Sequence, residues 1–191
     1  MPYLADSDYI PPRWLPKGHG QTIFPVLFRK MEELPFKRVR VDTPDGDFFH
    51  ADILAGERTP ARGAVILSHG LEGDSRRKYI RGMCLMLAGL GWDCVARNFR
   101  ACGGGMNRAP GMYHSGETGD LRLTVEYCLK AGYRRVLLAG FSMGGNQTLK
   151  YLGEEPDRVP PEVAGAVVFS VPCDLNGSAR KLAHPQNAVY M

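Results

Sequence analysis

The sequence predicts an α/β fold with a mostly parallel central sheet and helices on both faces. From residue 63 onward, short apolar runs alternate with segments whose apolar residues recur at helical spacing. Alternation of this kind builds parallel sheets with right-handed crossovers. Before residue 63, alternating valines, the turn pair Asp45-Gly46 and the apolar run 48–54 indicate a β-hairpin. The predicted sheet therefore begins with an N-terminal β-hairpin.

The expected strands after the hairpin are short, continuous apolar runs, which are typical of strands buried on both faces. These runs lie at 64–67, 92–96, 136–141 and 164–171. The expected helices carry one apolar stripe each. They cover 78–89, the segment around 121–129, and 143–153, in which Leu149 and Leu152 should point inward.

A length of 191 residues suits one globular body with a sizeable core. Residues 1–35 are rich in proline and are expected to form an irregular leader that packs on the body through apolar anchors. The anchors are Trp14, Ile23, Phe24, Leu27 and Phe28. Residues 36–191 are expected to form the α/β domain.

Charge and composition exclude several classes. A net charge of +4 gives no strong reason to expect a nucleic-acid partner. The longest apolar runs, 136–141 and 164–169, are far below the roughly 20 residues of a membrane span, so no transmembrane segment is expected. The five cysteines form an odd set without a Cys-x-x-Cys pair, and no ligand cluster has zinc spacing. A reduced, cytoplasmic protein without a metal site is therefore expected.

The sharpest motif is G-x-S-x-G at residues 140–144, between an expected strand and an expected helix. A direct turn from strand to helix strains the backbone of the central residue, here Ser142. Gly140 and Gly144 remove side chains that would clash at such a turn. The serine hydroxyl would then face a helix N-terminus, where backbone N–H groups stabilise negative charge. The pattern predicts a nucleophile elbow.

A second loop, Ser68-His-Gly-Leu-Glu-Gly73, follows the first expected parallel strand. In hydrolases with such an elbow, one oxyanion N–H comes from this loop and one from the residue after the nucleophile. These would be the N–H groups of Leu71 and Met143. His69 ends a buried strand and is expected to be structural, because the histidine of such a triad follows the serine in the chain. His114 is likewise expected to be structural more than catalytic.

Together these residues resemble the YheT-like branch of the α/β-hydrolases, whose relatives include the eukaryotic abhydrolase-domain esterases and lipases. The resemblance covers nearly the whole chain. It rests on His69-Gly-Leu-Glu-Gly, Asn98-Phe-Arg, Asn107-Arg, Tyr113-His-Ser-Gly-Glu-Thr, Asp120-Leu, Gly140-Phe-Ser-Met-Gly-Gly-Asn146 and Gly18-His-Gly-Gln-Thr-Ile23. The resemblance implies hydrolysis of small-molecule or lipid esters by a Ser-Asp-His triad, with no cofactor.

The chain also departs from that family. Members continue past the strand at 167–171 into a lid and further strands that carry the acid and the histidine, so the domain is expected to be truncated at its C-terminus. Asp174 and His184 follow Ser142 in the right order, but only about ten residues separate them. They remain weak candidates. The alternative to an ester hydrolase is a non-catalytic fragment or binding module that keeps the scaffold without acid and base.

The last expected strand, 164–171, is apolar and would lack an outer neighbour. An exposed apolar edge is a template for pairing with another chain. The segment 174–191 has the composition of turns more than of a strand that could cover this edge. Self-association through this edge is therefore expected.

Overall fold

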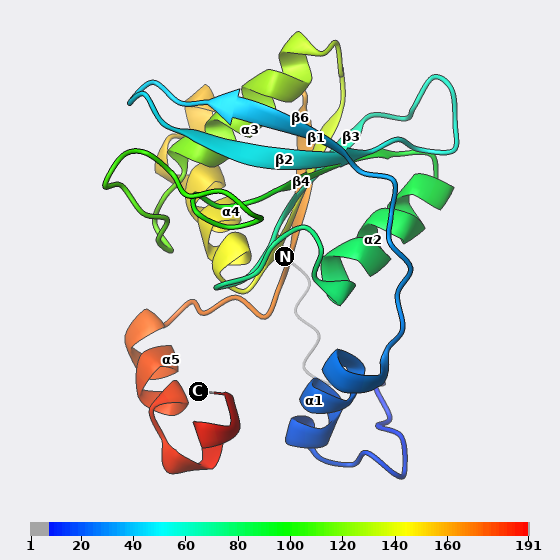
Figure 1. Ribbon diagram of the computed structural model, residues 1–191, viewed down its shortest axis with the longest axis vertical. Coiled ribbons are helices and arrows are strands. Elements are labelled where there is room, and N and C mark those ends of the chain that lie inside the picture. Colours follow the sequence, from blue (N-terminus) through cyan, green and yellow to red (C-terminus); the bar gives the residue numbers. More distant parts are fainter. Residues whose placement is uncertain (1–7, 191) are drawn as a thin grey trace. The chain divides into compact units, whose positions relative to one another are not determined.

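A six-stranded mixed sheet organises the main body of the computed structural model, which describes residues 8–190 (Figure 1). The chain divides into two units, Met1–Glu32 and Glu33–Met191, and each is described separately. The elements in chain order are α1 (Gly18–Phe28), β1 (Lys37–Asp42), β2 (Phe48–Leu54), β3 (Ala64–Ser68), α2 (Lys78–Gly89), β4 (Asp93–Arg97), α3 (Gly119–Lys130), β5 (Val136–Phe141), α4 (Met143–Glu154), a short 3-10 helix (Pro156–Arg158), β6 (Val163–Phe169), α5 (Leu175–Leu182) and a final 3-10 helix (Pro185–Tyr190).

The strand order is β1-β2-β4-β3-β5-β6. β1 and β2 form the expected hairpin, with Asp42 opposite Phe48 and Gly46 in the left-handed region at φ 78°. β2 pairs antiparallel with β4, and the remaining pairs are parallel. The predicted α/β architecture, mostly parallel with an N-terminal hairpin, is thus confirmed.

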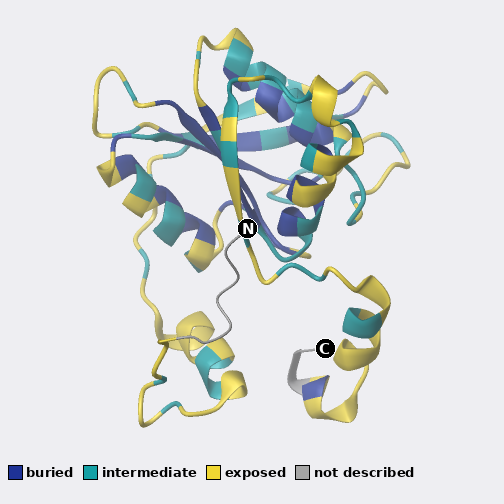
Figure 2. Ribbon diagram, turned by 180° about the vertical axis from the view of Figure 1, so that it is seen from behind, coloured by how far each residue is buried: buried dark blue, intermediate teal, exposed yellow. Residues whose placement is uncertain are grey.

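Each face of the sheet has its own core because successive side chains of a strand point to opposite faces. Ile66 faces α3 and α4, where it packs with Leu121, Val125 and Tyr151. Val65 and Leu67 face α2, where they pack with Ile80 and Cys84. Figure 2 shows the buried residues concentrated along the central strands and on the inner sides of these helices. Helices therefore cover both faces, as predicted.

Element boundaries agree with the sequence prediction to within about two residues, with β4 at Asp93–Arg97 and β6 ending at Phe169. The prediction that Leu149 points inward is wrong, because this side chain is 43% exposed. Leu152 packs against the core, as predicted. The inner face of α4 at this level is taken by Gln147 and Thr148, both fully buried. These polar side chains have hydrogen-bond partners inside the protein, so an apolar stripe does not mark this face of the helix.

The first unit contains a helix where an irregular leader was expected. α1 spans Gly18–Phe28 despite Pro25 at its eighth position. A proline removes one backbone donor and strains the preceding turn, but the apolar residues Ile23, Phe24, Leu27 and Phe28 keep helical spacing. How this unit packs stays a prediction.

Candidate active site

Loops of unusual backbone conformation lie at one edge of the sheet. Because β3, β4, β5 and β6 are parallel neighbours in the sheet, their carboxyl ends meet at this edge. Among residues 8–190, the non-glycine residues with a left-handed φ are Glu72, Ala101, Ser142 and Ser170, one after each of these four strand ends. A left-handed φ costs a non-glycine residue about 1 kcal/mol or more, and such strain clusters at functional sites. This edge is therefore the candidate site.

Ser142 occupies the turn between β5 and α4 with φ 52° and ψ −117°. Its N–H donates to the carbonyl oxygen of Phe169 at the end of β6, 2.8 Å away. Its own carbonyl accepts the N–H of Asn146 at 3.0 Å, which begins the hydrogen bonding of α4. The backbone is thus held on both sides of the strained residue. The motif at residues 140–144 predicts a turn of this kind.

Gly140 and Gly144 make the turn sterically accessible. A Cβ on Gly140 would lie 2.6 Å from the carbonyl oxygen of Gly144. A Cβ on Gly144 would lie 2.4 Å from the carbonyl oxygen of Ser68 and 2.5 Å from that of His69. These neighbours are backbone atoms, so they have little room to move. The close approach of α4 to the end of β3 requires glycine at 144.

The loop after β3 packs directly against the serine. A Cβ on Gly70 would lie 3.3 Å from Cβ of Ser142. The Gly70 N–H donates to the Tyr79 hydroxyl at 2.9 Å, which ties this loop to α2. Leu71 follows Gly70 and is 59% exposed. Within residues 8–190, the backbone N–H groups of Leu71 and Met143 donate to no protein acceptor. The two predicted oxyanion donors are thus unengaged, one in the loop after β3 and the other at the first residue of α4.

His69 is fully buried and has a partner for each ring nitrogen. Nδ1 lies 2.7 Å from the Gly70 carbonyl oxygen, and the Phe99 N–H donates to Nε2 at 3.1 Å. The tautomer with hydrogen on Nδ1 satisfies both contacts. Burial lowers the pKa of His69 to about 4, against the opposing effect of the Gly70 carbonyl. A neutral imidazole with both nitrogens engaged has a structural role, as the sequence suggested.

The structure shows a buried arginine beneath the site that the sequence did not predict. Arg97, the last residue of β4, is 1% exposed. Its Nε donates to the Ser68 hydroxyl at 2.8 Å, and its Nη2 donates to the Gln147 side chain. The Gln147 amide in turn donates to the His114 carbonyl oxygen at 2.8 Å. Burial lowers the pKa of Arg97 to about 10, while Glu117 and Asp120 oppose that shift. This chain links the ends of β3 and β4 to α4 one turn below the serine.

A second polar cluster anchors the loop that carries Leu71. The Asp52 carboxylate, on β2, accepts two bonds from Arg38 at 2.7 Å each, one from Ser75 and one from Asn98 at 3.1 Å. Burial raises the pKa of Asp52, but these hydrogen bonds outweigh it and hold the pKa below its ordinary value. The Asn98 oxygen also accepts the Ser75 N–H at 2.8 Å. The hairpin therefore fixes the far end of the loop 69–75.

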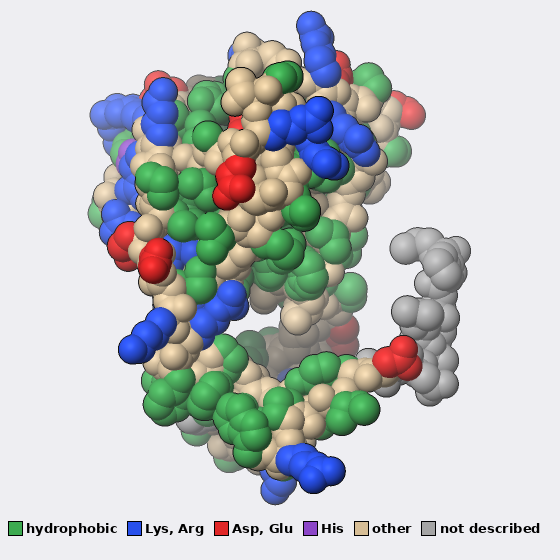
Figure 3. Space-filling model, turned by 90° about the vertical axis from the view of Figure 1, so that its right-hand side faces the viewer, with side chains coloured by type: hydrophobic (Ala, Val, Ile, Leu, Met, Phe, Trp, Pro, Cys, Tyr) green, Lys and Arg blue, Asp and Glu red, His purple; other side chains and the backbone are tan. Residues whose placement is uncertain are grey.

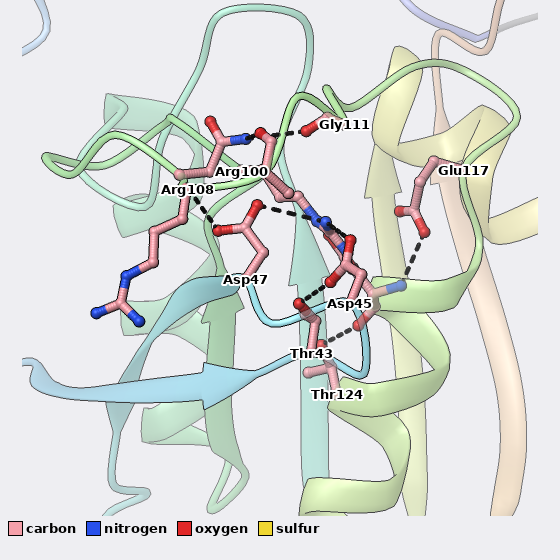
Figure 4. Close-up of polar contacts among 11 residues, drawn as sticks. Thr43, Asp45, Asp47, Arg100, Arg108, Gly111, Glu117 and Thr124 are labelled. Carbon is pink, nitrogen blue, oxygen red and sulfur yellow. Dashed lines mark hydrogen bonds and ion pairs between the residues drawn. The ribbon is translucent and has the colours of Figure 1, made fainter.

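A third cluster, around Arg100, ties the hairpin turn to the loop 98–118 between β4 and α3, and to α3 itself (Figure 4). Arg100 donates to both oxygens of Asp120 at 3.0 and 2.9 Å, and to Asp45 at 2.5 Å. Asp47 lies 3.4 Å from Arg100 and accepts the N–H of Arg108 at 2.8 Å. The pKa of Arg100 is raised, chiefly by its hydrogen bond to Asp120. Ion pairs of Arg100 with three carboxylates thus hold the rim of the candidate site together.

The other candidate triad residues are engaged locally. The Asp174 carboxylate caps α5 by accepting the Gly177 N–H at 2.9 Å. The His184 ring accepts the N–H of Gln186 at 3.3 Å, and the His114 ring accepts that of Gly116 at 3.1 Å. Within residues 8–190, no side chain hydrogen-bonds to the Ser142 hydroxyl. The structure therefore does not bring Asp174 or His184 together with Ser142.

The described residues hold neither a cluster of metal-ligating side chains nor a membrane-spanning helix. No group of three or more His, Cys, Asp or Glu side chains there could hold a metal ion. Over the same residues, no helix is long and apolar enough to cross a membrane.

Known proteins show the same fold and family. Over 193 aligned residues the chain is 31% identical to "Putative esterase YheT" of Escherichia coli, covering 98% of this chain and 55% of that protein. It is 29% identical to human phospholipase ABHD3, covering 96% of this chain and 46% of that protein. The chain thus spans about half the length of these curated relatives. The esterase Pf2001 of Pyrococcus furiosus superposes with a TM-score of 0.64 at 24% identity, over 79% of this chain and 57% of that one.

More than half of the chain matches the model of one protein family. The model of the alpha/beta hydrolase fold family matches residues 63–181, from the residue before β3 through most of α5. This range includes the strained turn at Ser142, the loop after β3 and the three parallel strand pairs. The chain therefore belongs to the α/β hydrolase fold family.

Proposed function

We propose that Ser142 is the nucleophile of a carboxylic-ester hydrolase that works through an acyl-enzyme. The observation that carries this proposal is the left-handed backbone of Ser142 at the start of α4. Strain at this position projects the hydroxyl over the helix N-terminus, where a developing negative charge is stabilised. The elbow glycines and the unengaged N–H groups of Leu71 and Met143 support the same proposal.

In the proposed reaction, Ser142 Oγ attacks the acyl carbon while a histidine removes its proton. The N–H groups of Leu71 and Met143 bind the oxyanion that forms on the carbonyl oxygen. The alcohol leaves with the proton from the histidine, and water then hydrolyses the acyl-enzyme. Since relatives are named esterase and phospholipase, we propose a small-molecule or lipid ester as substrate.

The histidine and the acid are proposed to belong to the part of the relatives' length that this chain does not span. Asp174 is engaged as a helix cap, and His184 lies in a local turn. Neither side chain hydrogen-bonds to Ser142, so both are poor candidates for this reaction. A cytoplasmic location and self-association through β6 remain further predictions from the sequence.

A fluorophosphonate probe tests the nucleophile. We expect strong labelling of a protein extended to the length of its relatives, and weak or absent labelling of the 191-residue chain. Ser142→Ala should abolish the labelling. Ser170→Ala is the matched control, because Ser170 follows the neighbouring strand with a similar φ of 51°. Labelling that survives Ser142→Ala, or that is lost with Ser170→Ala alone, would contradict the assignment.

One observation favours a second candidate, a binding module without catalysis. In the described residues no histidine contacts the Ser142 hydroxyl by a hydrogen bond. A serine without a base is a poor nucleophile at neutral pH. Absence of labelling in the extended protein, together with intact folding, would favour the binding module over the hydrolase.

A further inference from the structure

The first unit exposes a cluster of apolar side chains, which we call the leader patch: Ile10, Trp14, Phe24, Leu27 and Phe28. Four of them are between 63% and 86% exposed, and Phe24 is 36% exposed. The rings of Trp14 and Phe24 lie 4.7 Å apart, and those of Phe24 and Phe28 lie 4.9 Å apart. α1 contains no buried residue. Aromatic side chains on an exposed helix of this kind fit an interface more than bulk water.

Between residues 9 and 31 every charged side chain is basic, whereas Asp8 precedes this segment and Glu32 and Glu33 follow it. Residues 9–31 contain Arg13, Lys17, Arg29 and Lys30 and no Asp or Glu. All four basic side chains are exposed, and none forms an ion pair in the described part of the chain. Two of them precede α1 and two follow it, so positive charge lies at both ends of the helix. Figure 3 shows hydrophobic side chains at the surface of this unit, with Lys and Arg side chains and also acidic side chains at its margins.

We infer that the leader patch docks on an anionic lipid surface. Helices that lie in a membrane interface combine Trp, Phe and Leu on the apolar side with Lys and Arg at the margin. Phe24, Leu27 and Phe28 would enter the boundary between headgroups and acyl chains. Arg29 and Lys30 would stay at the level of the lipid phosphates. The four basic residues of 9–31 favour this partner, because anionic headgroups attract each of them. Of the acidic residues that flank the segment, Glu33 is already paired with Arg81.

This inference goes beyond the proposed hydrolase, because docking uses no residue of the candidate site. The proposed contact is peripheral and differs from a membrane span, because no helix among the described residues is long and apolar enough to cross a membrane. The contact would instead be reversible and dependent on salt, since it combines a small apolar area with four charges.

The test measures binding of the full 191-residue chain to vesicles of ether-linked phosphatidylcholine, with or without ether-linked phosphatidylglycerol. Ether lipids contain no ester bond at the chains, so the result does not depend on hydrolysis. Trp92→Phe leaves Trp14 as the single tryptophan, and its emission reports entry into the interface. Flotation of the unsubstituted chain with the vesicles provides a second readout. We expect a blue shift and flotation only with the anionic vesicles.

Two paired variants and one control complete the design. Arg29→Ala combined with Lys30→Ala should lower the partition coefficient about 30-fold. This follows because each basic residue near an anionic surface contributes about 1 kcal/mol to the binding free energy. Leu27→Asp with Phe28→Asp should abolish binding. Lys130→Ala with Arg158→Ala removes two exposed charges from the body and should leave binding unchanged. Equal loss in the control pair, or no binding to anionic vesicles, would overturn the inference. A lower melting temperature of Leu27→Asp with Phe28→Asp in the absence of lipid would overturn it as well, because the patch would then pack on the body.

Discussion

The backbone N–H of Phe99 donates to Nε2 of the buried His69, and the two rings lie 3.9 Å apart. The contact joins the loop after β4 to the end of β3 directly beneath the candidate site. It requires a neutral imidazole, because a protonated His69 would present a second N–H to the Phe99 donor. Stability should therefore respond to the charge of this one residue.

The first prediction concerns acid destabilisation through His69. Burial lowers its pKa from 6.5 to about 4 in the folded protein. Below about pH 6.5 the unfolded chain binds a proton that the folded protein does not, so stability falls as pH falls toward 4. The full effect is about 3 kcal/mol, and about 2 kcal/mol is lost between pH 7 and 5.

Urea unfolding at several pH values measures this slope. In His69→Gln the part of the slope that belongs to His69 should disappear, while the smaller contribution of His50, whose pKa burial also lowers, should remain. An unchanged slope in His69→Gln would show that other groups carry the acid sensitivity.

The second prediction contrasts two glycines of α4. Gly144→Ala places a Cβ 2.4 Å from the Ser68 carbonyl oxygen and should destabilise the fold by about 2 kcal/mol or more. Gly144→Val should be worse. Gly153→Ala is the matched control, because its Cβ meets no atom within 4 Å and alanine favours a helix by about 0.5–1 kcal/mol. Thermal melts of the two alanine variants should shift in opposite directions, and a Gly144→Ala that melts like the natural chain would refute the close approach.

Most of the fold could be predicted because its elements have clear periodicity. β3 is apolar at nearly every position, and α2 carries Ile80 and Cys84 on one stripe, so the hydrophobic pattern is sufficient for both. α1 was missed because proline and glycine content outweighed its apolar spacing. Pro25 costs the helix one hydrogen bond and does not forbid it.

The strained turn at Ser142 could be predicted because its residue types are steric requirements of one local turn. The buried polar side chains beneath this turn could not be predicted. Arg97 follows the apolar run 92–96, and Gln147 lies on the inner face of α4 where no apolar stripe marks it. Their burial is acceptable only because Arg97 donates to Ser68 and Gln147, and Gln147 donates to the His114 carbonyl oxygen. Such pairing joins residues 50 positions apart and leaves no periodic signal in a single sequence.

The third prediction concerns the Arg100 cluster. The Arg100 side chain is 13% exposed, and those of Asp120 and Asp47 are 5% and 0% exposed. Arg100→Met leaves these carboxylates without their cation, which should cost about 3–5 kcal/mol. Arg158→Met breaks an exposed pair with Glu155 and should cost less than about 1 kcal/mol. Denaturant unfolding compares the two variants, and similar small losses would show that Arg100 contributes little.

A double-mutant cycle refines that result. Asp120→Asn combined with Arg100→Met should cost less than the sum of the single changes, because each alone strands a buried charge. Additive losses would mean that the two side chains act independently despite their two hydrogen bonds.

The last prediction concerns the two edges of the sheet, which differ in chemistry. β1 carries Lys37, Arg38 and Arg40, and charged edge strands resist pairing with other chains. β6 contains no charged residue, and in the described part of the chain its outer side pairs with no strand. Val167 and Phe169 are 51% and 38% exposed. Beside them lies an apolar cavity of about 420 Å³ between α2 and the strands β5 and β6.

We therefore expect the 191-residue chain to self-associate, and a protein extended to the length of its relatives to do so much less. Val167→Lys should lower the association, because it places a charge on the apolar edge. Leu149→Lys is the control, since Leu149 is similarly exposed but lies on α4, away from the edge. Light scattering over a range of protein concentrations measures the mean mass. A monodisperse monomer at every concentration, or equal effects of the two lysine variants, would show that the edge of β6 does not drive association.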